Sequence, residues 1–228
     1  WVLAPVLLLD VITKEKATMS FSPNFAYNVL AEKIDEEELE GIDLSSLRII
    51  VNAAEPIRHD SHERFAKRFQ KYGFNPFALQ CLYGMAEMTL GATVTEPGKP
   101  LTELTVDRNE LSKGFVKPAD ENSIPRVCVS SGKPIGQVEV KIVDEKRNEI
   151  SDDLVGEVAV KSISMFDGYR NYPEKTAEVV ENGWYYSGDY GFKHNSEFFI
   201  IGRKKDIIIV AGKNIYPEDI EDTINQVE

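Results

Sequence analysis

The sequence predicts an α/β protein: a partial, mostly parallel α/β subdomain, then a small antiparallel β-barrel-like subdomain, then the start of a third domain. Helix and strand patterns alternate as far as about residue 95, whereas strand patterns dominate from Val127 onward. Between them, residues 96–126 interleave four prolines with charged residues, which predicts a long irregular segment. We therefore expect the chain to divide into 1–95, 96–126, 127–203 and 204–228.

The first 95 residues supply the alternating pattern. Apolar residues recur at helical spacing in 2–13, 24–38 and 61–72. Strand-forming residues are concentrated in 17–21, 47–54 and 79–84. The second helix is expected to carry Phe25, Val29 and Leu30 on one side and its acidic residues on the other. Strands that alternate with helices predict a mostly parallel sheet, whose ligands gather at the carboxyl ends of the strands.

Period-two alternation characterises the second half of the chain. Apolar and polar residues alternate in 137–144 and 156–161, and an apolar run at 198–201 follows a polar turn. Short strands of this kind, joined by turns, predict an antiparallel β unit. An acidic helix is expected to begin near Pro217, because proline is favoured at the first position of a helix.

Composition excludes several classes of function. The net charge of −12 argues against nucleic acid as a partner, because binding to a phosphate backbone requires Lys and Arg. Cys81 and Cys128 lack metal-ligand spacing and are expected to be buried thiols, as in a cytoplasmic protein. His59, His62 and His194 form no ligand set, and the first two are expected at the exposed start of a helix.

The opening ten residues are apolar but too short to span a bilayer, so no transmembrane segment is expected. They also lack an initiator Met. We interpret them as a buried helix that belongs to a longer chain.

One candidate site follows the strand at 79–84. Gly84 allows a backbone to approach a ligand closely, Tyr83 offers a flat face to a base, and Glu87 offers a hard oxygen ligand for Mg²⁺. The structural alternative is a turn with a packed tyrosine. The segment Ala54, Glu55 and Pro56 also follows a strand and places small residues where an aromatic ring could lie, although a plain strand-to-helix turn explains it as well.

A second candidate site lies where two glycine-flanked polar residues stand a short hairpin apart. The carboxylate of Asp189 can accept two hydrogen bonds, as both hydroxyls of a ribose require, and Arg203 can donate to ribose or phosphate oxygens. Alternatively, Asp189 is a turn residue and Arg203 forms a surface ion pair. Residues 131–136 superficially suggest a phosphate-binding loop, but they lack its full pattern and are interpreted as a turn.

Taken in order, the motifs resemble the adenylate-forming superfamily of acyl-CoA synthetases, adenylation domains and luciferases. They are 83–87, 156–158 with Gly168-Tyr169, 187–189, and Gly202-Arg203 with Gly212. Within it, the chain is most similar to fatty acyl-AMP ligases, also called long-chain fatty acid adenylate ligases. That likeness rests on 23–27, 52–56, 202–206 and the proline-rich stretch from Asp107 to Arg126, where these ligases carry an insertion.

The resemblance implies ATP and Mg²⁺ as cofactors and assigns a role to each candidate residue. Tyr83 and Gly84 would bind adenine together with the backbone at Ala54, Glu55 and Pro56. Glu87 would hold Mg²⁺, Asp189 the ribose, and Arg203 the ribose or phosphate; Glu87 and Arg203 would be the catalytic residues. Lys205 would be the hinge of a mobile C-terminal domain. Phe25 and Tyr27 would line the acyl pocket.

The implied reaction belongs to lipid metabolism. A fatty acid carboxylate would attack the α-phosphate of ATP, giving acyl-adenylate and pyrophosphate, and the acyl group would pass to an acyl carrier protein or a polyketide synthase carrier domain. The insertion would restrain the C-terminal domain and disfavour transfer to CoA. Ala86 and Ser187 stand where the superfamily more commonly has Thr.

The family's phosphate-binding loop and its catalytic lysine have no counterpart in the sequence, so we interpret the chain as a middle piece that is inactive alone. Pyrophosphate release by these 228 residues would contradict this.

Two other functions remain open at this stage. An acyl- or aryl-CoA synthetase would carry an ordinary loop at Asp107 to Arg126 rather than an anchored insertion. A non-catalytic homologue could bind an acyl or nucleotide ligand as a sensor. The joint presence of Glu87, Asp189 and Arg203 argues against the sensor, which would not need a Mg²⁺ carboxylate.

Overall fold

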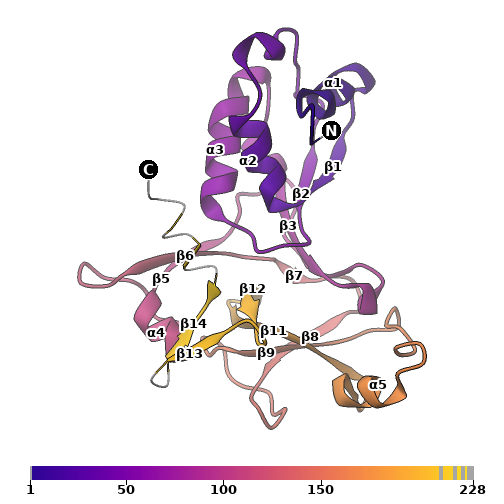
Figure 1. Ribbon diagram of the computed structural model, residues 1–228, viewed down its shortest axis with the longest axis vertical. Coiled ribbons are helices and arrows are strands. Elements are labelled where there is room, and N and C mark those ends of the chain that lie inside the picture. Colours follow the sequence, from indigo (N-terminus) through magenta and orange to yellow (C-terminus); the bar gives the residue numbers. More distant parts are fainter. Residues whose placement is uncertain (1, 211–212, 218–219, 222–223, 225–228) are drawn as a thin grey trace. The chain divides into compact units, whose positions relative to one another are not determined.

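The chain forms two compact units (Figure 1), of which the computed structural model describes residues 2–210, 213–217, 220–221 and 224. The first unit contains Trp1–Leu82 and Thr95–Thr102, and the second contains Tyr83–Val94 and Glu103–Glu228. Most of the helix predicted from Pro217 onward, and Gly212 of the last motif, lie outside the described residues.

The first unit has the predicted parallel sheet. Strands β1 (Met19–Ser22), β2 (Ile49–Asn52) and β3 (Leu79–Gly84) run parallel, with Met19 opposite Ile49 and Ile50 opposite Leu79. Its helices are α1 (Val6–Glu15), α2 (Asn24–Glu32) and α3 (His59–Phe69), with single 3₁₀ turns at Glu36–Leu39, Gln70–Tyr72 and Pro76–Ala78. The helix predicted over 24–38 is therefore broken, because Asp35 caps a new turn through reciprocal hydrogen bonds with Glu38.

Aromatic side chains fill the core between α2 and α3. The rings of Tyr27, Phe69 and Phe74 lie 4.7–5.2 Å from the ring of Phe65, and all four residues are buried. Phe25, predicted on the same side of α2 as Val29 and Leu30, is 44% exposed. The helix instead turns Ala26, Tyr27 and Leu30 inward, because these residues share one face at helical spacing.

His62 is also a correction. The sequence predicted an exposed residue at a helix start, but His62 is only 3% exposed and lies edge-on against the ring of Tyr27, 5.1 Å away. Burial, reinforced by nearby His59, lowers the pKa of the His62 imidazole from 6.5 to about 4. The ring is therefore neutral at physiological pH.

Acid is expected to destabilise the protein through His62. Between pH 6.5 and about 4 the unfolded chain binds a proton that the folded chain excludes, so stability is complete above pH 6.5 and falls as the pH falls. From pH 6.5 to pH 5 the expected loss is about 1.5 kcal/mol. Urea unfolding of the wild type and of His62→Gln at both pH values measures it. An equal loss in both proteins would contradict the assignment, because glutamine does not titrate.

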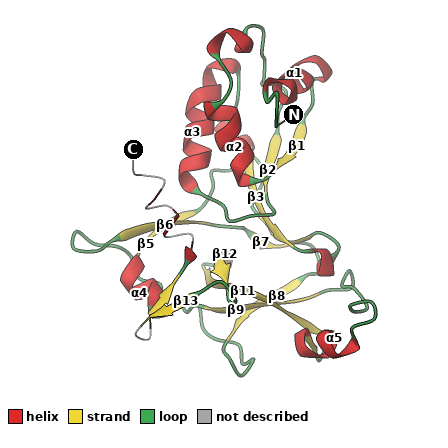
Figure 2. Ribbon diagram, viewed as in Figure 1, coloured by secondary structure: helices red, strands yellow, loops and turns green. Residues whose placement is uncertain are grey.

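The second unit contains the predicted antiparallel sheet (Figure 2), and the predicted fold class is confirmed. The long strand β11 (Trp184–His194) pairs antiparallel with β9 (Gly156–Lys161), β10 (Val180–Glu181) and β12 (Glu197–Arg203), and β9 pairs with β8 (Glu139–Val143). Smaller elements of this unit are the turn Ala86–Met88, helix α5 (Pro173–Val179) and the pairs β4 (Gly91–Val94) with β7 (Lys133–Pro134) and β13 (Ile208–Val210) with β14 (Lys213–Ile215).

The segment predicted to be irregular contains a hairpin with a short helix. Strands β5 (Glu103–Asp107) and β6 (Pro125–Val129) pair antiparallel, and α4 (Arg108–Ser112) lies between them. The expectation of an irregular segment at 96–126 was therefore wrong in part. The prolines led us to predict no strand here. Pro125 nevertheless occupies the first position of β6, where a missing N–H is tolerated.

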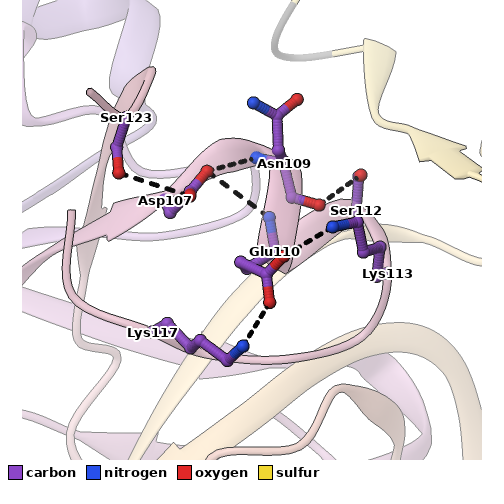
Figure 3. A network of polar contacts seen from close by, with 7 residues as sticks. All are labelled: Asp107, Asn109, Glu110, Ser112, Lys113, Lys117 and Ser123. Carbon is purple, nitrogen blue, oxygen red and sulfur yellow. Dashed lines mark hydrogen bonds and ion pairs between the residues drawn. The ribbon is translucent and has the colours of Figure 1, made fainter. Parts of the chain in front are cut away.

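Polar contacts hold α4 in place (Figure 3). Asp107 accepts hydrogen bonds from the backbone N–H groups of Asn109 and Glu110, which caps the helix. The carboxylate of Glu110 binds the ammonium groups of Lys113 and Lys117, which lower its pKa to about 2. All of these contacts are formed within residues 107–117.

An apolar contact anchors the hairpin to the rest of the second unit. Leu111 and Val106 are buried in one cluster with Phe192, Phe199 and Tyr216. Tyr216 follows β14, and Cζ of Arg126 lies 5.2 Å from the centre of the Tyr216 ring. The stretch from Asp107 to Arg126 is therefore an anchored element rather than an ordinary loop.

Candidate nucleotide-binding site

Three of the residues singled out in the sequence meet in the second unit. The hydroxyl of Tyr83 donates to Oδ2 of Asp189 over 2.8 Å, and Nε of Arg203 lies 3.4 Å from Oδ1 of the same carboxylate. The side chain of Asp189 is 15% exposed, whereas that of Arg203 is 62% exposed. The group is thus a sheltered carboxylate beside a cation that solvent can reach.

A β-bulge in β11 aims Asp189. The pairing of β11 with β9 shifts between Tyr186 and Tyr190, and Gly188 within the bulge has a φ of +72°, which glycine adopts without strain. The hydroxyl of Ser187 donates to the carbonyl of Val158 over 2.8 Å and accepts from the N–H of Asp189 over 3.0 Å. Arg203 is the cross-strand partner of Asp189 on β12, so the sheet itself places the two side chains together.

Burial raises the pKa of Asp189, while the hydrogen bond from Tyr83 and the charge of Arg203 act in the opposite direction. Burial likewise raises the pKa of Tyr83, whose hydroxyl therefore remains a donor. A carboxylate with little hydration, beside an exposed guanidinium, can accept hydrogen bonds from the hydroxyls of a ligand.

Gly84 is needed for the path of the chain itself. A Cβ at this position would lie 1.8 Å from the carbonyl oxygen of Leu90 and 2.9 Å from the Cα of Gly91. The N–H of Met85 donates to that same carbonyl over 2.8 Å. The backbone that approaches Gly84 closely is thus that of Leu90, which closes the loop around Glu87.

The carboxylate of Glu87 accepts a hydrogen bond from a tyrosine that was not among the predicted site residues. The hydroxyl of Tyr169 donates to Oε1 of Glu87 over 2.6 Å and lies 3.3 Å from the hydroxyl of Tyr185. The N–H of Phe166 donates to the backbone carbonyl of Glu87 over 2.9 Å. Burial and the Glu87 contact raise the pKa of Tyr169. Gly168-Tyr169 belongs to a motif on which the family resemblance rests, so the sequence indicated Tyr169 but not its hydrogen bond to Glu87.

Glu87 has features suited to a cation. It is half-buried, and within the described part of the chain it forms no ion pair. No cluster of three or more His, Cys, Asp or Glu side chains with metal-ligand geometry occurs among the described residues. Further oxygen ligands of a cation at Glu87 would be waters or phosphate oxygens, which Mg²⁺ commonly takes besides one or two carboxylates.

The remaining candidates lie in the first unit. Ala54 has a φ of +75°, a left-handed conformation that non-glycine residues rarely adopt. The carboxylate of Glu55 accepts a hydrogen bond from the N–H of Phe25, so these two predicted residues lie together. Tyr27 is buried within the core between α2 and α3, away from the exposed ring of Phe25.

Lys205 is exposed at the centre of a turn between β12 and β13. The N–H of Asp206 donates to the carbonyl of Arg203 over 3.0 Å and closes the turn. Among the residues that the structure describes, no helix is both long and apolar enough to cross a membrane.

Comparison with known proteins settles the family. The sequence profile of the AMP-binding enzymes matches residues 2–170, which is most of the chain. The chain belongs to the AMP-binding enzyme family. Its relatives in this family include fatty acid ligases of two kinds. The medium-chain-fatty-acid–[acyl-carrier-protein] ligase JamA of Moorena producens is 38% identical over 97% of this chain. The probable long-chain-fatty-acid–AMP ligase FadD30 of Mycobacterium tuberculosis is 30% identical over 97%.

Solved structures of AMP-binding enzymes agree with this family and with the fold. A fatty acid AMP ligase of Legionella pneumophila superposes with a TM-score of 0.85 at 41% identity, over 99% of this chain and 40% of its own. A structure from work on fatty acyl-adenylate ligases of E. coli and L. pneumophila gives a TM-score of 0.93 at 29% identity, over 97% and 41%. The chain spans about 40% of the length of the curated relatives and of these structures.

Proposed function

We propose that the whole protein activates a fatty acid as an acyl-adenylate, using ATP and Mg²⁺, and passes the acyl group to a carrier protein. The observation that supports this most directly is the Tyr83–Asp189–Arg203 group beside the Glu87 loop, in a chain of the AMP-binding enzyme family. The relatives include a probable fatty acid–AMP ligase and a ligase whose name gives an acyl carrier protein as the acceptor. Cys81 and Cys128 are both buried thiols, which suits the cytoplasm.

Each residue has a role that follows from its position. Asp189 accepts hydrogen bonds from the ribose hydroxyls, and Arg203 donates to ribose or phosphate oxygens from its exposed side. Tyr83 and Gly84 contribute to the binding of adenine, and the family resemblance also assigns the backbone at Ala54, Glu55 and Pro56 to adenine. Catalysis then rests on alignment and on charge stabilisation where the carboxylate meets the α-phosphate.

Glu87 is the residue that would hold Mg²⁺, and its half-buried carboxylate without an ion pair fits this role. Mg²⁺ bound there supplies positive charge to phosphate oxygens in the transition state. Tyr169 orients the carboxylate through its 2.6 Å hydrogen bond. Phe25 lies at the start of α2 with its ring exposed and is retained as a wall of the acyl pocket, whereas Tyr27 supports that helix from within the core.

Replacing Tyr169 by phenylalanine is expected to raise the Mg²⁺ concentration needed for half-maximal rate by about fivefold, because one oxygen of Glu87 loses its fixed orientation. The ring remains to pack against Phe166, so folding is expected to be retained. Activity is measured against free Mg²⁺ at saturating ATP. Tyr172→Phe, at an exposed position on the same segment, serves as the control. An unchanged Mg²⁺ requirement would exclude this role.

The anchored hairpin supports an acyl-AMP ligase over an acyl-CoA synthetase. An acyl-AMP ligase was expected to pack the stretch from Asp107 to Arg126 against the rest of the protein, and an acyl-CoA synthetase was expected to carry an ordinary loop there. Leu111 and Val106 hold Tyr216, which follows the proposed hinge at Lys205. We infer that the hairpin restrains the chain beyond the hinge and so disfavours the movement needed for transfer to CoA.

Replacing Tyr216 by alanine is expected to raise acyl-CoA formation by about fivefold or more, because the buried ring packs in one cluster with Val106 and Leu111 of the hairpin. Products are separated after incubation of the whole protein with CoA. The control is Tyr172→Ala, which removes an exposed tyrosine of the same unit. Equal acyl-CoA formation by both variants would argue against the restraint.

The proposed function is tested by ATP–pyrophosphate exchange in the whole protein. Labelled pyrophosphate is expected to enter ATP only when fatty acid and Mg²⁺ are both present, because exchange requires reversible formation of the acyl-adenylate. Binding of ATP without exchange, at any fatty acid chain length, would instead indicate a sensor.

A further inference from the structure

A buried polar network lies at the end of β2, where the first unit places the starts of α2 and α3. Asn52 is completely buried, and Asn24, Ser61 and His62 are each less than 5% exposed. Nδ2 of Asn52 lies 2.9 Å from Oδ1 of Asn24 and 2.8 Å from Nε2 of His62. Nδ2 of Asn24 donates to the hydroxyl of Ser61 over 2.9 Å. None of these groups takes part in the function proposed above.

The network has only one consistent set of donors and acceptors. The N–H of Arg58 can only donate, and it lies 3.0 Å from Asn24, so the Asn24 atom that faces it is the carbonyl oxygen. The Asn52 atom that faces the same oxygen must then be the amide nitrogen. One hydrogen of that nitrogen points to Asn24 and the other to Nε2 of His62.

His62 must therefore accept with Nε2 and carry its proton on Nδ1. A doubly protonated ring would turn an N–H toward the NH₂ group of Asn52, and burial already lowers the pKa of this imidazole to about 4. His62 is thus a fixed, neutral hydrogen-bond acceptor under the amide of Asn52.

The same network clamps both ends of the loop at 53–58. Asn52 precedes the loop, Arg58 ends it, and the carbonyl of Asn24 binds both of them. Within the loop, Glu55 accepts the N–H of Phe25, and Ala54 is held at a φ of +75°. A non-glycine residue stays in a left-handed conformation only where its surroundings fix it. The loop contains Ala54, Glu55 and Pro56, whose backbone is the proposed adenine wall.

We propose that His62 is a positioning residue: through Asn52 it holds the loop at 53–58 in the conformation that receives the adenine of ATP. The proposal rests on the proposed function, because it assumes that this loop meets the nucleotide. It predicts that the acceptor at Nε2, and not the imidazole as such, is what the loop requires.

Two variants of the whole protein separate positioning from simple packing. In His62→Gln the side-chain oxygen can take the place of Nε2 as acceptor, whereas His62→Leu fills similar space and leaves the amide of Asn52 without an acceptor. The KM for ATP is expected to rise about tenfold in His62→Leu and to stay within about twofold of wild type in His62→Gln. The kcat is expected to change little in either. Equal KM values in the two variants would overturn the proposal.

Amide hydrogen exchange tests the proposal without relying on activity. The amides of residues 53–55 and 57–58 are expected to exchange at least about tenfold faster in His62→Leu, and at the wild-type rate in His62→Gln. Unchanged exchange in His62→Leu would overturn the positioning role. If the two variants show this difference in amide exchange but the wild-type protein catalyses no ATP–pyrophosphate exchange, the proposed function fails. The role of His62 in holding the loop then still stands.

Discussion

Replacing Asp189 by alanine in the whole protein is expected to lower kcat/KM for acyl-adenylate formation by at least about 100-fold. Its carboxylate binds the hydroxyl of Tyr83 over 2.8 Å and lies 3.4 Å from Nε of Arg203. Each hydrogen bond to a charged group contributes about 1.5–3 kcal/mol, and two such bonds to ribose would be lost. The buried hydroxyl of Tyr83 would also lose its acceptor, which loosens the adenine side of the site.

The measurement is steady-state pyrophosphate release at varied ATP, with Asp152→Ala as the control. Asp152 lies in the same unit and forms an exposed ion pair with Lys193, a kind of contact that contributes little. The control is expected to stay within about twofold of wild type. A loss below about threefold in Asp189→Ala would show that the carboxylate does not bind the nucleotide.

Replacing Gly84 by alanine is expected to cost at least about 4 kcal/mol of folding stability, a value reached only when a substitution breaks a specific feature. The added Cβ would lie 1.8 Å from the carbonyl oxygen of Leu90, a backbone atom that cannot turn aside. Relief requires the loop around Glu87 to move, and the hydrogen bond from Met85 to Leu90 would be lost. Activity is therefore expected to fall together with stability.

Unfolding in urea measures this cost, and Gly98→Ala is the matched control. Gly98 has open space around its Cα but a φ of +76°, so alanine there meets only the left-handed backbone penalty of about 1 kcal/mol. A cost at Gly84 no larger than the cost at Gly98 would mean that the loop adapts freely.

Local patterns predicted the elements that depend on local sequence. The apolar run that includes β2 is buried, and the alternating residues of β8 and β9 form adjacent antiparallel strands. The hairpin of β5 and β6 was missed because its strands are separated by more than fifteen residues and one begins with proline. Pairing of that kind depends on contacts between residues distant in sequence, which a local sequence pattern does not predict.

The candidate site divides in the same way. Asp189 and Arg203 were found because glycines flank them on neighbouring strands, and the sheet pairs them directly. Their partner Tyr83 is 106 residues away from Asp189, and Tyr169 is 82 residues away from Glu87, so neither contact could be read from spacing. His62 was expected to be exposed because it begins a polar helix, and only the packing of α2 against α3 buries it.

The most direct test of the proposed function is to incubate the whole protein with Mg-ATP, a labelled long-chain fatty acid and CoA, and to separate the products by chromatography. We expect acyl-AMP to accumulate although CoA is available, because the hairpin at Val106 and Leu111 holds the chain at Tyr216. Acyl-CoA as the main product would contradict the account and assign the protein to the acyl-CoA synthetases.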